Sequence, residues 1–270
     1  MNIKAAILFE NNKPLIVDNI EWRDKLYTGQ VLVKVNKSGI CGSQIGEIKG
    51  IKGKDEYLPH LLGHEGCGRI VDIGPGVKTL KIEDKVVLHW KRGSGINSDP
   101  PNYYLKDKKI NAGFVTTFND YAVVSENRCT PISEEISDDD AALFGCAITT
   151  GFGVIENKAR LKIGESIAIL GAGGIGLNII QAAKLVSAYP IIAVDLYDER
   201  LKLAKKFGAT HIINSAKSDF VKEIRSIVNN SLNVFVDNTG VPEIIEKGYE
   251  LINKEGRLIL VGVPQKGKNI

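Results

Sequence analysis

Short runs of apolar residues, alternating with polar ones, recur through the first 137 positions and indicate β-strands. Clusters of glycine, proline and asparagine, such as Gly74-Pro75-Gly76, separate the runs and predict turns. Several short strands at this spacing are typical of a barrel or a sandwich. We therefore predict a β-rich domain over residues 1–137. Its strands are expected at residues 5–9, 15–20, 31–36, 66–73, 85–88 and 120–124.

Residues 91–113 interrupt this pattern. They contain Gly93, Gly95, Pro100 and Pro101 among many polar side chains. Long segments of this composition lie at the surface and are more often functional than idle. We predict a long loop here that contacts the substrate or a second subunit.

A helix is predicted to begin after Ser137. The Ser137 hydroxyl can accept a hydrogen bond from the N–H of Asp140, whose carboxylate can return one. Asp138 and Asp139 add negative charge in the first turn, which suits the helix dipole. We expect one helix over residues 138–160 that carries Cys146 and links the β-rich domain to the remainder.

From residue 161 the pattern changes to short apolar runs that alternate with amphipathic segments. This alternation predicts a doubly wound parallel sheet with helices on both faces, an α/β domain over residues 161–270. Such dinucleotide-binding sheets usually have six strands, so we expect this one to lack its last strand. The expected strands are 167–170, 191–194, 211–213, 234–236 and 257–261, and the expected helices are 175–186, 199–207, 220–228 and 243–252.

A glycine-rich turn joins the first of these strands to its helix. Its glycines, Gly171, Gly173 and Gly176, have the spacing that places a pyrophosphate on a helix N-terminus. Asp195 ends the next predicted strand, where a carboxylate can accept hydrogen bonds from the adenosine ribose. Its charge would repel a 2′-phosphate, so NAD is favoured over NADP. Arg200 either reaches the same region or is an ordinary surface residue of the helix.

Bulk composition excludes several classes of function. The 270 residues are 43% hydrophobic and 25% charged, and the net charge is only +3, with no basic stripe that would indicate nucleic-acid binding. No apolar run is long enough for a signal peptide or a membrane span. We therefore expect a cytoplasmic protein with neither a nucleic acid nor a membrane as partner.

Three residues form a candidate metal site. Two thiols and one imidazole, Cys41, Cys146 and His64, can bind Zn²⁺ and leave its fourth position open. The spacing alone does not show that Cys41 meets Cys146, and buried core cysteines remain the alternative. The other two cysteines, Cys67 and Cys129, are expected to be structural.

Taken together, the motifs resemble those of the zinc-dependent alcohol dehydrogenases of the medium-chain dehydrogenase/reductase superfamily, nearest to the glutathione-dependent formaldehyde dehydrogenase type. The resemblance implies a GroES-like catalytic domain before the Rossmann domain, one catalytic zinc, NAD, and a small alcohol or aldehyde as substrate. The matching stretches run in the family's order along nearly the whole chain: Cys41-Gly42-Ser43, Leu62 to Gly68, Gly145 to Gly151, Gly171 to Gly176, Asp195 and Val261 to Pro264.

The resemblance also implies roles for individual residues. Cys41, His64 and Cys146 would bind the zinc, and Glu65 would lie near it or act as an occasional ligand. Ser43 would pass the proton of the alcohol, and Trp90 would line the substrate pocket. The residues implied to contact the cofactor are Thr150, Gly171, Gly173, Gly174, Ile175, Gly176, Asp195, Arg200, Val261 and Val263.

Three features depart from that family. Gln44 stands where an aspartate usually orients the zinc-bound histidine, and Gly46 cannot end a proton relay. Residues 91–113 contain no cysteine, so we expect no structural zinc. Family members also continue for several dozen residues, which include the last strand and the edge that joins subunits into homo-oligomers. We therefore expect a C-terminally truncated member without the usual joining edge.

These departures leave three functions open. The first is an NAD- and zinc-dependent alcohol or aldehyde oxidoreductase. The second is a catalytically weakened or inactive dinucleotide-binding remnant of that family. The third is a structural or partner-binding remnant that binds neither cofactor nor metal.

Overall fold

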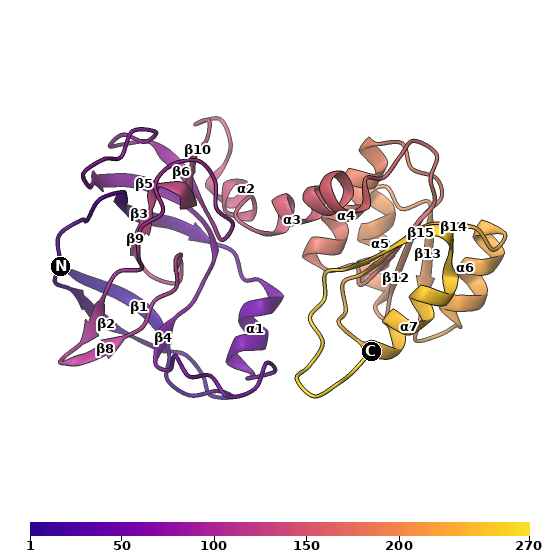
Figure 1. Cartoon of the computed structure of the whole chain (residues 1–270), viewed down its shortest axis with the longest axis horizontal. Helices are drawn as coiled ribbons and strands as arrows, with labels where there is room; N and C mark the ends of the chain where they lie inside the picture. The colour runs from indigo at the N-terminus through magenta and orange to yellow at the C-terminus, as the bar shows by residue number, and fades with distance from the viewer. The chain divides into compact units, whose positions relative to one another are not determined.

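The structure, a computed structural model, describes all residues from 1 to 270. The chain forms two compact units, Met1–Cys146 and Ala147–Ile270 (Figure 1). No helix in either unit combines the length and apolar character that crossing a membrane requires.

The first unit is built from two five-stranded sheets. One has the strand order β4-β1-β2-β7-β8 and the other β10-β6-β5-β3-β9. All six predicted strands are confirmed. The strands of this unit are β1 (Asn2–Leu8), β2 (Ile16–Trp22), β3 (Gln30–Ser38), β4 (His60–Leu61), β5 (Glu65–Ile73), β6 (Lys85–His89), β7 (Tyr103–Leu105), β8 (Lys108–Ile110), β9 (Tyr121–Ser125) and β10 (Cys129–Pro131).

Alternation along β3 explains why both faces of its sheet are buried. Val31 and Val33 join one apolar cluster, together with Val124 of the paired strand β9. Leu32 points to the opposite face and packs in a second cluster with Val123. Successive side chains of a strand point to opposite faces, so β3 and β9 supply both cores at once.

The interpretation of residues 91–113 as one long loop is wrong in its second half. Residues 103–110 form a hairpin of β7 and β8, and β7 pairs with β2 through Trp22 and Tyr103. The Tyr103 side chain is fully buried, and its hydroxyl accepts a hydrogen bond from the N–H of Val123 at 3.0 Å. This long-range contact anchors the hairpin and cannot be seen in the local composition.

The expected single helix over residues 138–160 is interrupted. Helix α2 (Asp138–Leu143) begins at the predicted cap, where the Ser137 hydroxyl accepts from the Asp140 N–H at 3.1 Å. The chain then turns before α3 (Ala147–Gly153), and a π-helical turn, η2 (Val154–Ala159), follows. Cys146 therefore lies in the turn between two helices. A third short helix, α1 (Gly42–Ile48), was not predicted within the β-rich region.

The second unit has the predicted α/β architecture. Its five parallel strands have the order β13-β12-β11-β14-β15. Helices α4 and α5 pack on one face of the sheet, and α6 and α7 pack on the other. The elements are β11 (Ile167–Leu170), α4 (Gly174–Leu185), β12 (Ile191–Asp195), α5 (Asp198–Phe207), β13 (His211–Asn214), α6 (Phe220–Val228), β14 (Leu232–Asp237), α7 (Pro242–Leu251) and β15 (Ile252–Leu260).

A buried carboxylate, Glu126, organises the loops beside the second sheet of the first unit. It begins a 3-10 turn, η1 (Glu126–Arg128), and its side chain accepts hydrogen bonds from the N–H groups of Ile96, Thr79 and Lys78 and from the Thr79 hydroxyl. Burial alone would raise the pKa of this carboxyl, but the hydrogen bonds outweigh burial and lower the pKa to about 2. Ionised Glu126 therefore stabilises the fold more than protonated Glu126 does.

We expect Glu126→Gln to lower the free energy of unfolding of the first unit by about 3 kcal/mol at neutral pH, the value of a shift from ~4.3 to about 2. Because the folded-state pKa lies below the unfolded value, this stabilisation is complete above the unfolded pKa. It is lost as pH falls toward the folded pKa, so the difference between wild type and variant should shrink at acid pH. Urea unfolding between pH 6 and pH 3 measures it. Glu135→Gln, an exposed control, should change little at either pH.

Candidate metal and cofactor sites

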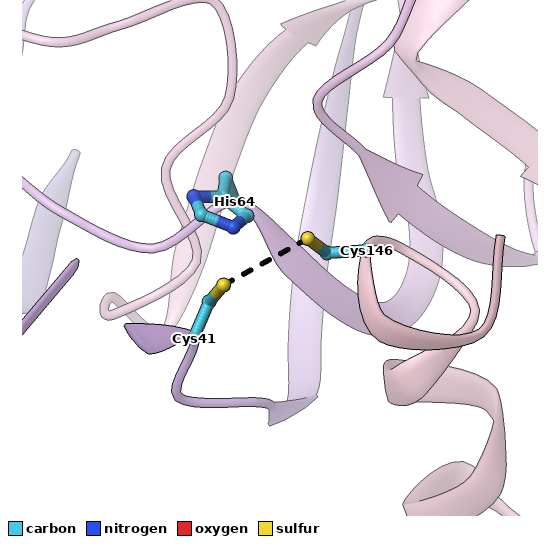
Figure 2. A group of neighbouring side chains, drawn as sticks. All are labelled: Cys41, His64 and Cys146. Carbon is cyan, nitrogen blue, oxygen red and sulfur yellow. Dashed lines mark hydrogen bonds between the residues drawn. The ribbon is translucent and has the colours of Figure 1, made fainter. Parts of the chain in front are cut away.

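Three separate segments of the first unit bring the candidate metal ligands together. Cys41 is the residue before α1, and His64 is the residue before β5. Cys146 lies in the turn between α2 and α3. Figure 2 shows both sulfur atoms and one ring nitrogen of His64 facing a common point.

The geometry of this group matches a zinc centre. The three possible ligand atoms lie within 4.8 Å of one another, and the Cys41 and Cys146 Sγ atoms are 3.9 Å apart. Two sulfurs bound tetrahedrally at ~2.3 Å from Zn²⁺ would be ~3.8 Å apart. His64 Nε2 is buried and has no hydrogen-bond partner. A buried nitrogen without a partner is costly, and a metal ion would satisfy it.

The thiol of Cys41 is prepared to ionise. The Cys146 side chain lowers the pKa of the Cys41 thiol most, and burial opposes it. The His64 side chain and the hydroxyl and N–H of Ser43 lower this pKa further, well below the ordinary range of a thiol. Thiolates are the form that binds metal, so the site favours the ligand state of Cys41.

The turn that carries Cys146 requires a close approach of backbones. A side chain on Gly145 would place its Cβ 2.3 Å from the Leu88 carbonyl oxygen and 2.6 Å from the Glu65 Cα. Glycine at this position therefore lets the chain pack against β5 and β6 beside the candidate ligands. This packing of Gly145 is the physical reason why the helix predicted over residues 138–160 is interrupted.

Gln44 contacts His64 directly from helix α1. Its amide oxygen accepts a hydrogen bond from the N–H of Gly63, and its Nε2 lies 3.0 Å from His64 Nδ1. The Gln44 Nε2 also donates a hydrogen bond to Glu47 Oε2 at 3.2 Å. A backbone N–H can only donate, so it fixes the amide oxygen toward Gly63 and the amide NH₂ toward His64.

This orientation has a consequence for the tautomer of His64. Nδ1 faces a donor and must accept, so a neutral His64 carries its proton on Nε2. A carboxylate in place of the amide would instead accept from a protonated Nδ1 and leave Nε2 free for a metal. Gln44 therefore opposes the tautomer that metal binding through Nε2 requires.

Glu65 is not among the three residues whose possible ligand atoms converge. It is the first residue of β5 and is 3% exposed. Its carboxylate lies against Gly39, where an added Cβ would be 2.7 Å from Glu65 Oε1. The structure thus places Glu65 next to His64 in sequence but outside the group of Cys41, His64 and Cys146.

The second unit carries the candidate cofactor turn between β11 and α4. Gly171 has φ of +90°, which favours glycine, and a Cβ on Gly176 would lie 2.0 Å from the Gly171 carbonyl oxygen. No atom lies within 4 Å of the Cβ positions of Gly173 and Gly174. Helix α4 starts there, at Gly174 and Ile175, without a side-chain cap. Its first N–H groups are thus available to a phosphate.

Asp195 closes this turn from the end of β12. Its Oδ2 accepts the Ala172 N–H at 2.8 Å, and its Oδ1 accepts the Tyr197 N–H at 3.0 Å. Each carboxylate oxygen can accept a further hydrogen bond, as from a ribose hydroxyl. The Arg200 guanidinium lies 3.6 Å from Asp195 Oδ2 and 4.9 Å from the Tyr197 ring. Arg200 therefore lies beside the candidate ribose position.

The segment after β14 was missed in the sequence. Asp237 is fully buried, and its carboxylate accepts from the N–H groups of Thr239 and Gly240. Asn238 donates to the Gly171 carbonyl oxygen at 3.4 Å, so this segment touches the glycine turn. The position of this segment directly after a buried strand could have indicated a binding role, because ligands of parallel sheets bind at the carboxyl ends of strands.

The remaining predicted residues have the following positions. Val261 follows β15, and its N–H donates to the Asp237 carbonyl oxygen at 2.8 Å, while Val263 is 60% exposed. Thr150 lies in α3, which packs on α4 where Gly151 approaches Asn178. Trp90 follows β6 and is 48% exposed.

Comparisons with known proteins identify the family of this chain. Residues 27–134 match the family described as alcohol dehydrogenase GroES-like domain, and residues 174–270 match zinc-binding dehydrogenase. An S-(hydroxymethyl)glutathione dehydrogenase from Synechocystis is 29% identical over all of this chain and 80% of its own length. Benzyl alcohol dehydrogenase from Acinetobacter calcoaceticus is 31% identical, with a TM-score of 0.89 over all of this chain and 79% of its own. An alcohol dehydrogenase zinc-binding domain protein from Burkholderia ambifaria is 28% identical, with a TM-score of 0.91 and the same coverage.

Proposed function

The chain belongs to the zinc-dependent alcohol dehydrogenases of the medium-chain dehydrogenase/reductase superfamily, and we propose that it transfers a hydride between a small alcohol or aldehyde and NAD(H) at one zinc site. The observation that carries the proposal is the convergence of two thiols and one imidazole on one point. These ligand atoms fit zinc in type and spacing, and the buried His64 Nε2, which has no hydrogen-bond partner, is available as a metal ligand. Zinc held there would polarise an alcohol or carbonyl oxygen as a Lewis acid.

The chain's own residues then have distinct tasks. Cys41, His64 and Cys146 would hold the metal. The Ser43 hydroxyl, in the first turn of α1, would accept the proton that the alcohol releases and pass its own proton on toward solvent. Trp90 would line the apolar part of the substrate pocket. A single metal is proposed because the 91–113 segment offers no cysteine for a second one.

The cofactor would be held by the second unit. The open Gly173-Gly174 start of α4 would bind the pyrophosphate, and Asp195 would accept from the adenosine ribose. Thr150, Val261 and Val263 would contact the nicotinamide. We propose NAD over NADP because the Asp195 carboxylate would repel a 2′-phosphate, although Arg200 lies beside it.

Asp195→Asn is expected to weaken NADH binding by roughly 10-fold, since a hydrogen bond to a charged group becomes one to a neutral group. The same change should improve NADPH binding, because the repulsion disappears while Arg200 stays. Fluorescence titration of both reduced cofactors measures the two affinities. Arg200→Met in the Asp195→Asn background should remove the gain for NADPH. An unchanged preference for NADH in Asp195→Asn would show that Asp195 does not select the cofactor.

One observation favours a second candidate, a dinucleotide-binding protein with weakened catalysis. Gln44 directs a donor at His64 Nδ1 and so opposes metal binding through Nε2. Titration of NADH by fluorescence, combined with a panel of alcohols and aldehydes on the zinc-loaded chain, separates the two functions. Turnover of any alcohol with NAD supports the oxidoreductase. Cofactor binding without turnover of any substrate supports the second candidate.

A further inference from the structure

Arg128 is a buried cation with no hydrogen-bond or ion-pair partner in the chain. The residue is 6% exposed, and its Nε is buried without a hydrogen-bond acceptor. No hydrogen bond or ion pair joins its guanidinium to any carboxylate or carbonyl of the chain. Buried charges are usually paired because removing a charge from water is costly. Arg128 therefore lacks the anionic partner that a buried charge usually has.

The acid closest in sequence is already engaged. Glu126 Oε1 accepts from the N–H groups of Lys78 and Thr79 and from the Thr79 hydroxyl, and its Oε2 accepts from the Ile96 N–H. Both carboxylate oxygens thus accept hydrogen bonds from the neighbouring loops, and Glu126 forms no ion pair with Arg128. No carboxylate of the chain therefore balances the charge of Arg128.

The surroundings of Arg128 are cationic and aromatic. The guanidinium carbon lies 5.1 Å from the centre of the Phe114 ring, which covers one face of the group. The Gly93 N–H donates to the Asn127 carbonyl oxygen at 2.7 Å, which places Arg92 beside Arg128. Burial lowers the pKa of Arg128 most, and the positive charge of Arg92 lowers it further. A second guanidinium near a buried one raises the cost of the charge and strengthens the attraction for an anion.

Strand pairing places Arg128 beside the edge strand of the sheet that begins next to His64. Glu65, directly after His64, pairs with His89 of β6, and Leu88 of β6 pairs with Cys129 at the start of β10. Arg128 precedes Cys129, so it lies two strands from His64, on the order of 10 Å at ~4.8 Å per strand. That distance is within the length of a small substrate.

We propose that Arg128 and Arg92 form a binding site for an oxyanion, a carboxylate or a phosphate-sized group. The planar guanidinium presents parallel N–H donors that match two oxygens on one centre, and Arg92 adds charge from the exposed side. The group is either a free anion or the far end of a substrate that reacts at the metal site. The free-anion binding does not depend on the proposed oxidoreductase function.

Thermal unfolding of the full, zinc-loaded chain in sulfate against chloride at equal ionic strength tests the site. Sulfate stabilises most proteins slightly, so the site-specific part is the difference between variants. The control Arg69→Met removes a surface arginine paired with Glu134, and it should keep the wild-type rise in Tm. Arg128→Met should lose the saturable part of that rise. Arg92→Met, which changes an exposed residue and so tolerates substitution, should weaken it.

The source of the anion is separated by kinetics. An alcohol that ends in a carboxylate is compared with the same alcohol ending in an amide. If the substrate supplies the anion, Arg128→Met raises KM for the carboxylate by roughly 10- to 100-fold and leaves KM for the amide unchanged. If a free anion occupies the site, the ratio of the two KM values stays the same while the sulfate response is lost.

The proposal is overturned if the saturable response to sulfate is the same in wild type, Arg69→Met, Arg128→Met and Arg92→Met. It is also overturned if the wild-type chain shows no saturable response. Both results are independent of turnover, so they are distinct from a failure of the proposed oxidoreductase function.

Discussion

Replacing Cys146 with serine is expected to lower zinc affinity and alcohol turnover each by more than roughly 100-fold, because loss of a ligand should exceed the 10- to 100-fold cost of losing a group that only orients one. The Cys146 Sγ lies 3.9 Å from that of Cys41, and a neutral hydroxyl cannot replace a thiolate there. Binding of NADH should remain, because its residues lie in the second unit. Competition with a chromophoric chelator measures zinc affinity directly.

The matched control is Cys129→Ala. Cys129 is 6% exposed and packs in the core of the first unit, where burial raises the pKa of its thiol. We expect this change to lower stability modestly while zinc affinity stays at the wild-type value. If Cys146→Ser binds zinc as tightly as Cys129→Ala, the assignment of Cys146 as a ligand is wrong.

Exchanging the polar groups of Gln44 and Glu47 is expected to raise zinc affinity by roughly 10- to 100-fold. In the variant Gln44→Glu with Glu47→Gln, a carboxylate faces both Gly63 and His64, and the new amide of residue 47 faces that carboxylate. The carboxylate accepts from His64 Nδ1–H, so Nε2 is free for the metal. The net charge of the chain does not change, which excludes a general electrostatic effect.

Glu47→Gln alone is the control for this exchange. It keeps the Gln44 amide against His64 and should leave zinc affinity near the wild-type value. ¹⁵N NMR of the metal-free chain gives a second readout that does not involve activity. His64 should carry its proton on Nε2 in wild type and on Nδ1 in the exchanged variant. The same tautomer in both proteins would refute the role assigned to Gln44.

The fold of the second unit was predictable because the sequence patterns that indicate it are local. Each of its strands is a short apolar run, and each helix is an amphipathic segment between two of them. Gly171 has a positive φ, and Gly176 packs against the Gly171 carbonyl oxygen five residues earlier, so the local spacing indicates the turn. Asp195 was found for the same reason, since it ends the strand beside that turn.

The features that sequence reasoning missed depend on contacts between distant residues. The hairpin of β7 and β8 is held by Tyr103 against Val123, and local composition suggested only a loop. The interruption before Cys146 follows from Gly145 packing on Leu88 and Glu65. Gln44 was visible as a departure, but the direction of its amide depends on the Gly63 N–H. The isolation of Arg128 and the anchoring role of Glu126 likewise appear only in three dimensions.

Transfer of deuterium tests the central claim most directly. The zinc-loaded chain is incubated with NAD and alcohols deuterated at the carbinol carbon, and the reduced cofactor is analysed by mass spectrometry. We predict deuterium in the reduced nicotinamide for at least one alcohol, and none after the zinc is removed by a chelator. Cofactor binding without deuterium transfer from any alcohol, at full zinc occupancy, would contradict the proposed function.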